Sequence, residues 1–209
     1  MLRIIIADDH NIVRRGIKEI LKEEYPSAHV EEVGDAEDLI KHVMKDEWDV
    51  VLTDISMPGR SGLDALTQIR QMYPKLPVVV LSVYPADQYG IRALKAGASG
   101  YLTKDSAPDE LVKAIRTVLL GKKYITPLLA EKLASVFDTE ADKPLHEYLS
   151  DREYEVFKLL AMGKAVSDIA QTMNLGVTTI STYRSRILVK MNMKTNADLT
   201  LYAVENKLI

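Results

Sequence analysis

The first 120 residues alternate between short apolar runs and stretches with helical periodicity, and this alternation constrains the fold more than any other feature. The apolar runs cover residues 3–8, 29–33, 49–54, 77–82 and 100–103. The helical stretches lie near 10–24, 36–46, 62–73, 85–96 and 108–120. Strict alternation of this kind predicts a parallel sheet with helices on both faces. The first, third and fourth runs are nearly all apolar, as expected of strands that are buried on both sides.

The remainder of the chain follows a different pattern. Residues 121–148 allow a short helix after Pro127, followed by the acidic, turn-prone stretch DTEADKPLHEY. Four helical segments and no strand come after it, near 150–162, 166–173, 177–191 and 196–206. The first of these opens with Ser150 and Glu153 in the spacing of a capping box. We therefore predict an α/β domain over 1–121, a linker with a short helix over 122–148, and an all-α domain over 149–209.

Composition excludes several classes of protein. The chain has no cysteine, so neither a disulfide framework nor a thiolate metal site is possible. No apolar stretch approaches the roughly 20 residues of a membrane helix, and the start, MLRIIIADDH, is too soon interrupted by acids to be a signal peptide. Hydrophobic content of 47% with 27% charged residues is typical of a soluble globular protein. We expect a cytoplasmic protein with no membrane partner.

Polar residues gather where the predicted strands end. Asp8 and Asp9 end the first run, Asp54 the third, Ser82 the fourth, and Lys104 follows the fifth. In an open α/β sheet these carboxyl ends share one edge, where ligands bind. Three carboxylates in one crevice repel one another, and a bound Mg²⁺ would remove that repulsion. The alternative is that each Asp caps a helix or turn. A hydroxyl and a lysine on the same edge make the cation site the favoured interpretation.

The same arrangement suggests a reaction. A carboxylate at neutral pH acts as a nucleophile without a general base. Mg²⁺ and Lys104 are suited to neutralise the oxygens of a phosphoryl group in transfer, where positioning and charge supply most of the catalysis. The product would be an acyl phosphate on Asp54, with Ser82 placed to donate a hydrogen bond to it.

Four stretches of this region carry a resemblance. IIIADDH, VVLTDISMPGRSG, VVVLS and ALKAGASGYLTKD resemble, in order, the receiver domain of two-component response regulators. The resemblance implies a five-stranded sheet in the order 2-1-3-4-5 and phosphorylation of Asp54 by a partner sensor histidine kinase. It implies that Mg²⁺ is held by Asp8, Asp9, Asp54 and the backbone carbonyl of Ser56. It also implies a phosphoryl-binding and switch set of Ser82, Tyr101 and Lys104, with the tyrosine ring turning inward.

The segment 177–191 has two distinct faces when it is placed on a helix. Ile180, Ile187 and Met191 share one face, and small hydroxyl residues share the opposite face with Val189. The stretch 177–194 also contains four basic residues and no acid. Such a helix suits a major groove, where hydroxyls approach base edges and cations reach phosphates. Periodicity alone leaves an ordinary surface helix equally possible.

The sequence LSDREYEVFKLLAMGKAVSDIAQTMNLGVTTISTYRSRILVKM resembles the LuxR-type helix-turn-helix of NarL/FixJ regulators. Ala165 stands where relatives often have a capping residue, so the second helix is expected to start elsewhere. The DNA-binding residues that follow from the resemblance and the helix face are Lys164, Thr178, Thr179, Ser181, Thr182, Ser185, Arg186 and Lys190. Leu199 and Tyr202 of the last helix would form a dimer contact. Packing within the same domain is an equal alternative for these two.

Together these observations predict a non-enzymatic transcription factor that is switched by phosphorylation of Asp54, binds promoter DNA, and forms a homodimer on DNA or when phosphorylated. One alternative is a constitutive DNA-binding regulator that uses the first domain only for dimerisation. The other is a phosphatase with an aspartate nucleophile. Such enzymes carry a second Asp two residues after the nucleophile, where this chain has Ser56, so the phosphatase is disfavoured.

Overall fold

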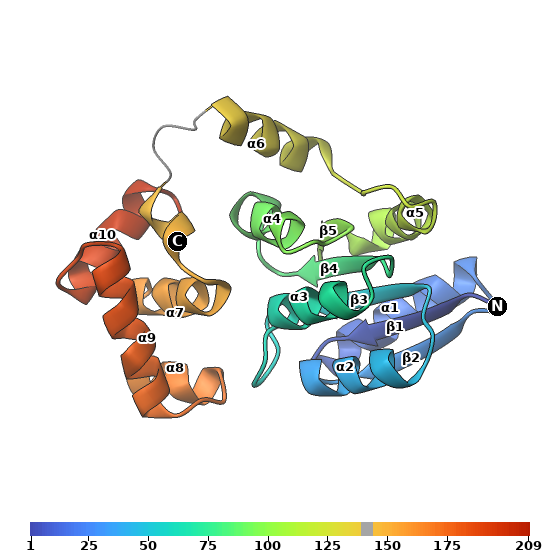
Figure 1. Cartoon of the computed structure of the whole chain (residues 1–209), viewed down its shortest axis with the longest axis horizontal. Coiled ribbons are helices and arrows are strands. Elements are labelled where there is room, and N and C mark those ends of the chain that lie inside the picture. Colours follow the sequence, from blue (N-terminus) through green and yellow to red (C-terminus); the bar gives the residue numbers. More distant parts are fainter. Residues whose placement is uncertain (139–143) are drawn as a thin grey trace. The chain divides into compact units, whose positions relative to one another are not determined.

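The chain forms two compact units, Met1–Ser135 and Val136–Ile209. A computed structural model describes residues 1–138 and 144–209, so part of the predicted linker, residues 139–143, lies outside the described residues (Figure 1). In the described part of the chain, no helix combines the length and the apolar character needed to cross a bilayer.

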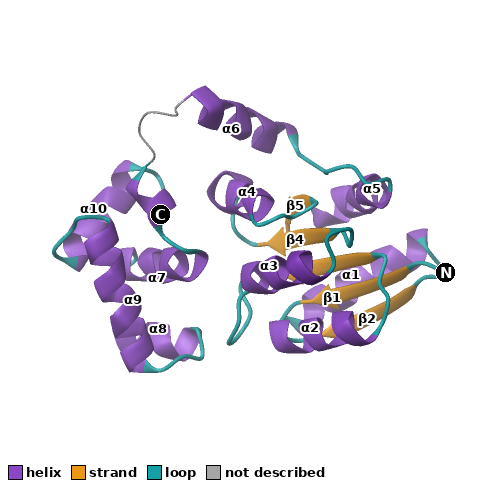
Figure 2. Ribbon diagram, in the orientation of Figure 1, coloured by secondary structure: helices purple, strands orange, loops and turns teal. Residues whose placement is uncertain are grey.

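The first unit is a five-stranded parallel sheet in the order β2-β1-β3-β4-β5, which confirms the predicted fold class (Figure 2). Its strands are β1 (Arg3–Ala7), β2 (His29–Val33), β3 (Val50–Asp54), β4 (Val78–Ser82) and β5 (Gly100–Thr103). Its helices are α1 (Asn11–Glu24), α2 (Ala36–Lys45), α3 (Gly62–Met72), α4 (Ala86–Lys95) and α5 (Ala107–Leu119). Each element lies within about two residues of its predicted position.

The hydrophobic core of the unit lies on both faces of the sheet. Ile4, Ile6, Leu52 and Leu81 belong to the cluster that α1 and α5 cover, while the alternating residues of the same strands face the other side, on which α2 and α3 lie (Figure 1). All five residues of β3 and of β4 are buried. The central strands therefore hold whatever follows their last residue in a fixed position.

The chain after α5 continues to pack on this unit. The backbone N–H of Tyr124 donates to the carbonyl of Ser99 over 2.7 Å, and Tyr124 forms a parallel bridge with Gly100 at the outer edge of β5. Helix α6 (Pro127–Asp138) follows, and its Leu129 is fully buried against Gly90 of α4. A methyl group on Gly90 would lie 2.7 Å from Leu129 Cδ1. The first unit thus extends beyond the predicted domain end at residue 121.

The second unit contains a short 3₁₀ helix, η1 (Leu145–Tyr148), and four α-helices: α7 (Asp151–Ala161), α8 (Val166–Thr172), α9 (Val177–Lys190) and α10 (Asn196–Glu205). The capping box predicted from Ser150 and Glu153 is present at the start of α7. Helix α8 begins at Val166, with Ala165 at its N-cap and no side-chain capping bond. The expectation that Ala165 would displace the start of this helix was wrong, since α8 keeps the predicted boundary without a cap.

Candidate functional site

The acidic residues meet at the carboxyl edge of the sheet, as predicted. Asp8 follows β1 and Asp54 is the last residue of β3, and both side chains are buried. Lys104 follows β5, where its backbone N–H donates to the carbonyl of Ser82 over 2.8 Å. Its ammonium lies 2.7 Å from Asp8 Oδ2 and 2.8 Å from Asp54 Oδ2. The ammonium thus bridges two carboxylates from neighbouring strands.

Burial and charge act in opposite directions on this pair. Burial raises the pKa of the Asp54 carboxyl to about 6, although the hydrogen bond and charge of Lys104 oppose the rise. Burial also lowers the pKa of Lys104, but its contacts with Asp54 and Asp8 outweigh this and leave the pKa above its ordinary value. The backbone N–H of Ile55 donates to Asp54 Oδ1 over 2.7 Å and fixes the carboxylate. A second positive charge at this edge would favour the ionised form of Asp54 further.

The donor atoms suit a divalent cation. Asp8, Asp9, His10 and Asp54 each offer one ligand atom, and these atoms all lie within 4.8 Å of one another. Asp9 is exposed, so the group opens to solvent on one side. Carboxylate oxygens and water are the usual ligands of Mg²⁺. The residues present therefore fit the predicted cation.

The predicted switch residues lie beside this group. Ser82 ends β4 fully buried, and its Oγ accepts a hydrogen bond from the backbone N–H of Tyr84 over 3.1 Å. Tyr101 of β5 is also fully buried, and its hydroxyl donates to the carbonyl of Tyr84 over 2.7 Å. The ring of Tyr101 is therefore turned inward in this structure, and the Ser82 and Tyr101 side chains both hold the segment that leads into α4.

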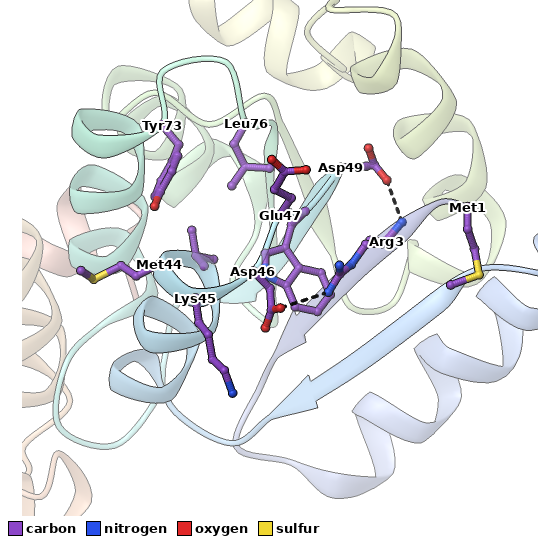
Figure 3. A pocket seen from close by; sticks show the side chains of 11 residues that line it. Met1, Arg3, Met44, Lys45, Asp46, Glu47, Asp49, Tyr73 and Leu76 are labelled. Carbon is purple, nitrogen blue, oxygen red and sulfur yellow. Dashed lines mark hydrogen bonds and ion pairs between the residues drawn. The ribbon is translucent and has the colours of Figure 1, made fainter.

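A separate cavity of about 640 Å³ lies at the opposite edge of the sheet, where the strands begin (Figure 3). Within this cavity, Arg3 contacts two of the acidic residues, Asp46 and Asp49. The Arg3 guanidinium lies 3.6 Å from Asp46 and stacks over Trp48 at 4.9 Å, and the Arg3 backbone N–H donates to Asp49. The Asp46 carboxylate beside Arg3 is partly exposed, whereas Asp54 is buried beside Lys104, so we place the site at the carboxyl edge instead.

Helix α9 has the two faces that the sequence predicts. Ile180, Ile187 and Met191 are buried in the second unit. All of the predicted DNA-binding residues are exposed: Lys164, Thr178, Thr179, Ser181, Thr182, Ser185, Arg186 and Lys190. A hollow of about 290 Å³ lies on this face, lined by Thr178, Thr179, Thr182, Tyr183 and Arg186. The face is polar and cationic, as a surface for DNA requires.

Local hydrogen bonds define what this face offers to a ligand. The Thr182 hydroxyl donates to the carbonyl of Thr178 over 2.9 Å, and the Ser185 hydroxyl donates to the carbonyl of Ser181 over 3.1 Å. Their protons point back into the helix, so the oxygens face outward as acceptors. Lys190 differs from the rest of the set because its ammonium lies 2.6 Å from the buried carboxylate of Glu153.

Two family models match the chain. Residues 4–116 match the response regulator receiver domain, and residues 147–203 match the bacterial regulatory proteins of the luxR family. The response regulator UvrY of Escherichia coli is 34% identical over 209 residues, covering 100% of this chain and 96% of that protein. The response regulator GacA of Pseudomonas aeruginosa is 35% identical over 211 residues, covering 100% of this chain and 98% of that protein.

The chain belongs to the response regulators. Among solved structures, RcsB from Salmonella enterica serovar Typhimurium bound to a promoter in the presence of a phosphomimetic is 30% identical, with a TM-score of 0.65, and covers 97% of this chain and 98% of that chain. A complex of RcsB with DNA matches with a TM-score of 0.60 at 29% identity, over 97% of this chain and 98% of that chain. The predicted transcription regulator with a receiver domain and a LuxR-type DNA-binding domain is thereby confirmed.

The two residues predicted at a dimer contact of this response regulator lie inside the second unit. Leu199 is fully buried, and the half-buried Tyr202 has its hydroxyl 3.0 Å from His146 Nδ1. Packing within the domain, the alternative left open by the sequence, is what the structure shows for Leu199. The exposed apolar residues of α10 are Leu201 and Val204, at 61% and 58% exposure.

Three residues of the acidic site escaped the sequence analysis. A Cβ on Gly62 would lie 1.7 Å from the carbonyl oxygen of Asp54, so only glycine fits at the start of α3. The Arg14 guanidinium donates to the backbone carbonyl of Asp8. His10 places its ring beside Asp8 and Asp9. The signals were visible in the sequence, as the GRSG turn, as the histidine that follows two acids, and as an arginine one helical turn later.

Proposed function

We propose that Asp54 is the phosphoacceptor of this response regulator and that a sensor histidine kinase is its phosphoryl donor. The observation that carries the proposal is the Lys104 ammonium, which bridges Asp8 and Asp54 at 2.7 and 2.8 Å at the end of a buried strand. An oxygen of Asp54 attacks phosphorus, and the bond from phosphorus to the donor nitrogen breaks. Lys104 is then placed to neutralise an oxygen of the new acyl phosphate.

Mg²⁺ held by Asp8, Asp9, Asp54 and the carbonyl of Ser56 would supply the remaining positive charge for the transferred group. Asp8 is fully buried and fixed between Lys104 and the backbone N–H of His10, which donates to Asp8 Oδ1 over 2.8 Å. The Ser82 hydroxyl exchanges its contact with Tyr84 for one with the phosphoryl group. The segment leading into α4 is then released from Ser82, which gives the receiver a two-state element.

Intact mass spectrometry tests the acceptor. The protein is incubated with acetyl phosphate, with and without Mg²⁺, as wild type, Asp54→Ala and Asp105→Ala. Asp105 is an exposed carboxylate next to Lys104 and serves as the matched control. We expect one phosphoryl adduct that needs Mg²⁺, disappears in Asp54→Ala and persists in Asp105→Ala. No adduct on folded wild type would refute the proposal and favour the constitutive regulator. Continuous phosphate release on small esters would favour the phosphatase instead.

We propose further that α9 reads DNA and that the response regulator binds as a homodimer. The hydroxyls of Ser181, Thr182 and Ser185 face outward, while Arg186 supplies charge for a phosphate. The exposed Leu201 and Val204 stand one turn apart on α10 and suit a contact with a second copy. Two-fold related copies read half-sites about one turn of DNA, or multiples of it, apart.

Selection of bound sequences from a random duplex pool tests this division of roles. Thr182→Val should change the selected bases. Arg186→Ala should weaken binding to all duplexes alike and lower the salt slope by about 1. Lys207→Ala, an exposed cation outside this face, is the control and should leave both unchanged. A change of base preference in Arg186→Ala would show that the division of roles is wrong.

A further inference from the structure

His10 is held against the carboxylates of the acidic site. It is the N-cap residue of α1, but its side chain makes no capping hydrogen bond with that helix. Its Nδ1 lies 2.7 Å from Asp9 Oδ1 and 3.3 Å from Asp8 Oδ1, and 62% of the side chain is exposed. The imidazole therefore stands on the solvent side of the site, with one nitrogen directed at two oxygens that belong to the cation-binding group.

These separations match those between ligands of one metal ion. Bonds of 2.0–2.1 Å in an octahedral shell place adjacent ligand atoms about 3.0 Å apart. The two distances from His10 Nδ1 lie on either side of that value. A single ion can therefore contact the nitrogen and both oxygens after small movements of exposed side chains.

The two oxygens of Asp8 face two different side chains. Oδ2 contacts the Lys104 ammonium at 2.7 Å, while Oδ1 faces His10. The side of Asp8 that is directed at His10 is thus not the side that Lys104 occupies. A cation on the Oδ1 side would meet an imidazole nitrogen as well as carboxylate oxygens, which is a mixed donor set.

We propose that Nδ1 of His10 is a ligand of the receiver's divalent cation and that it makes the site prefer Co²⁺ and Zn²⁺ over Mg²⁺. The proposal rests on the cation site of the proposed function. Imidazole nitrogen binds Co²⁺ and Zn²⁺ well, whereas Mg²⁺ favours oxygen ligands and water. A site made of oxygens alone would lack this nitrogen contribution. The plain alternative is that His10 only forms a surface ion pair with Asp9.

Calorimetric titration of the untagged full chain with Mg²⁺, Co²⁺ and Zn²⁺ distinguishes a metal ligand at His10 from an ion pair with Asp9. The visible absorption of bound Co²⁺ reports on the ligands of that ion. Four proteins are compared: wild type, His10→Ala, His29→Ala and Asp8→Asn. Because His10 makes no capping bond, His10→Ala does not remove a helix cap. His29, a half-exposed histidine at the start of β2, is the control for unspecific binding of these ions to imidazole.

We expect His10→Ala to lower the affinity for Co²⁺ and Zn²⁺ at least tenfold and to change the affinity for Mg²⁺ less than threefold. The absorption spectrum of bound Co²⁺ should also change. His29→Ala should bind the ions as wild type does, and Asp8→Asn should lower the affinity for all three ions. Equal affinities in wild type and His10→Ala, or an equal loss for all three ions, would overturn the role of His10. If Asp8→Asn left Mg²⁺ binding unchanged, the cation site of the proposed function would fail as well, and the two failures are thus told apart.

Discussion

Replacing Asp54 by Asn should stabilise the metal-free receiver at neutral pH. The pKa of Asp54 rises from 3.8 to about 6, mainly because the carboxylate is buried. The folded protein therefore keeps a proton between about pH 4 and 6 that the unfolded chain has lost, so the charged carboxylate lowers stability as the pH rises through this window. At about 1.36 kcal/mol for each pKa unit, the full effect is about 3 kcal/mol.

The isosteric amide removes this charge and keeps an oxygen for the N–H of Ile55. In the presence of a chelator, we expect the free energy of unfolding of Asp54→Asn to exceed that of wild type by about 1 kcal/mol at pH 4.5 and by about 3 kcal/mol at pH 7.5. Urea unfolding followed by tryptophan fluorescence measures this, since the single tryptophan, Trp48, lies in the first unit. With a slope of about 2 kcal/mol per molar urea, the midpoint at pH 7.5 should rise by about 1.5 M.

Two controls make the interpretation specific. Asp105→Asn removes an exposed carboxylate and should change stability by less than about 0.5 kcal/mol. Mg²⁺ at about 100 times its dissociation constant should add about 2.7 kcal/mol to wild type and so cancel most of the difference. Equal stability of wild type and Asp54→Asn at pH 7.5, or a difference that is the same at both pH values, would refute the reasoning.

Three further substitutions test the packing. Gly90→Ala should be less stable than Gly16→Ala by about 1–3 kcal/mol by tryptophan fluorescence, because a methyl group at Gly90 meets Leu129 while one at Gly16 meets nothing within 4 Å. Ala165→Ser should stabilise the second unit by about 0.5–2 kcal/mol by adding the missing cap of α8, measured by circular dichroism. Lys190→Met should destabilise that unit by about 1–2 kcal/mol, because it leaves the buried carboxylate of the capping box without its cation; an unchanged melting curve would refute this.

The sequence was sufficient for the strand-end residues because topology alone gathers them. Once five strands run parallel, Asp8, Asp54 and Lys104 must share an edge whatever the details of packing. Gly62 could not be predicted in the same way, since its need for glycine depends on how closely α3 approaches the carbonyl of Asp54. The GRSG turn marks a glycine there, but the close approach itself is a property of the packed protein.

The second unit shows a similar limit. The face of α9 was predictable because Ile180 and Ile187 share one side of this 14-residue helix and most hydroxyl residues the other, although Val189 is exposed among them. Helix α10 is short and carries apolar residues on several sides, so periodicity did not distinguish the buried Leu199 from the exposed Leu201. The contact between Lys190 and Glu153 joins residues 37 positions apart and required the arrangement of α7 and α9.

The bridge between Tyr124 and Gly100 has a consequence for the outer edge of the sheet. β5 is the last strand in the order, and an uncovered edge strand presents unpaired N–H and carbonyl groups to other chains. The segment after α5 occupies this edge, with the Tyr124 N–H on the carbonyl of Ser99. A receiver fragment that ends at residue 121 would leave the edge bare and should self-associate, whereas one that ends at Ser135 should remain monomeric without phosphorylation.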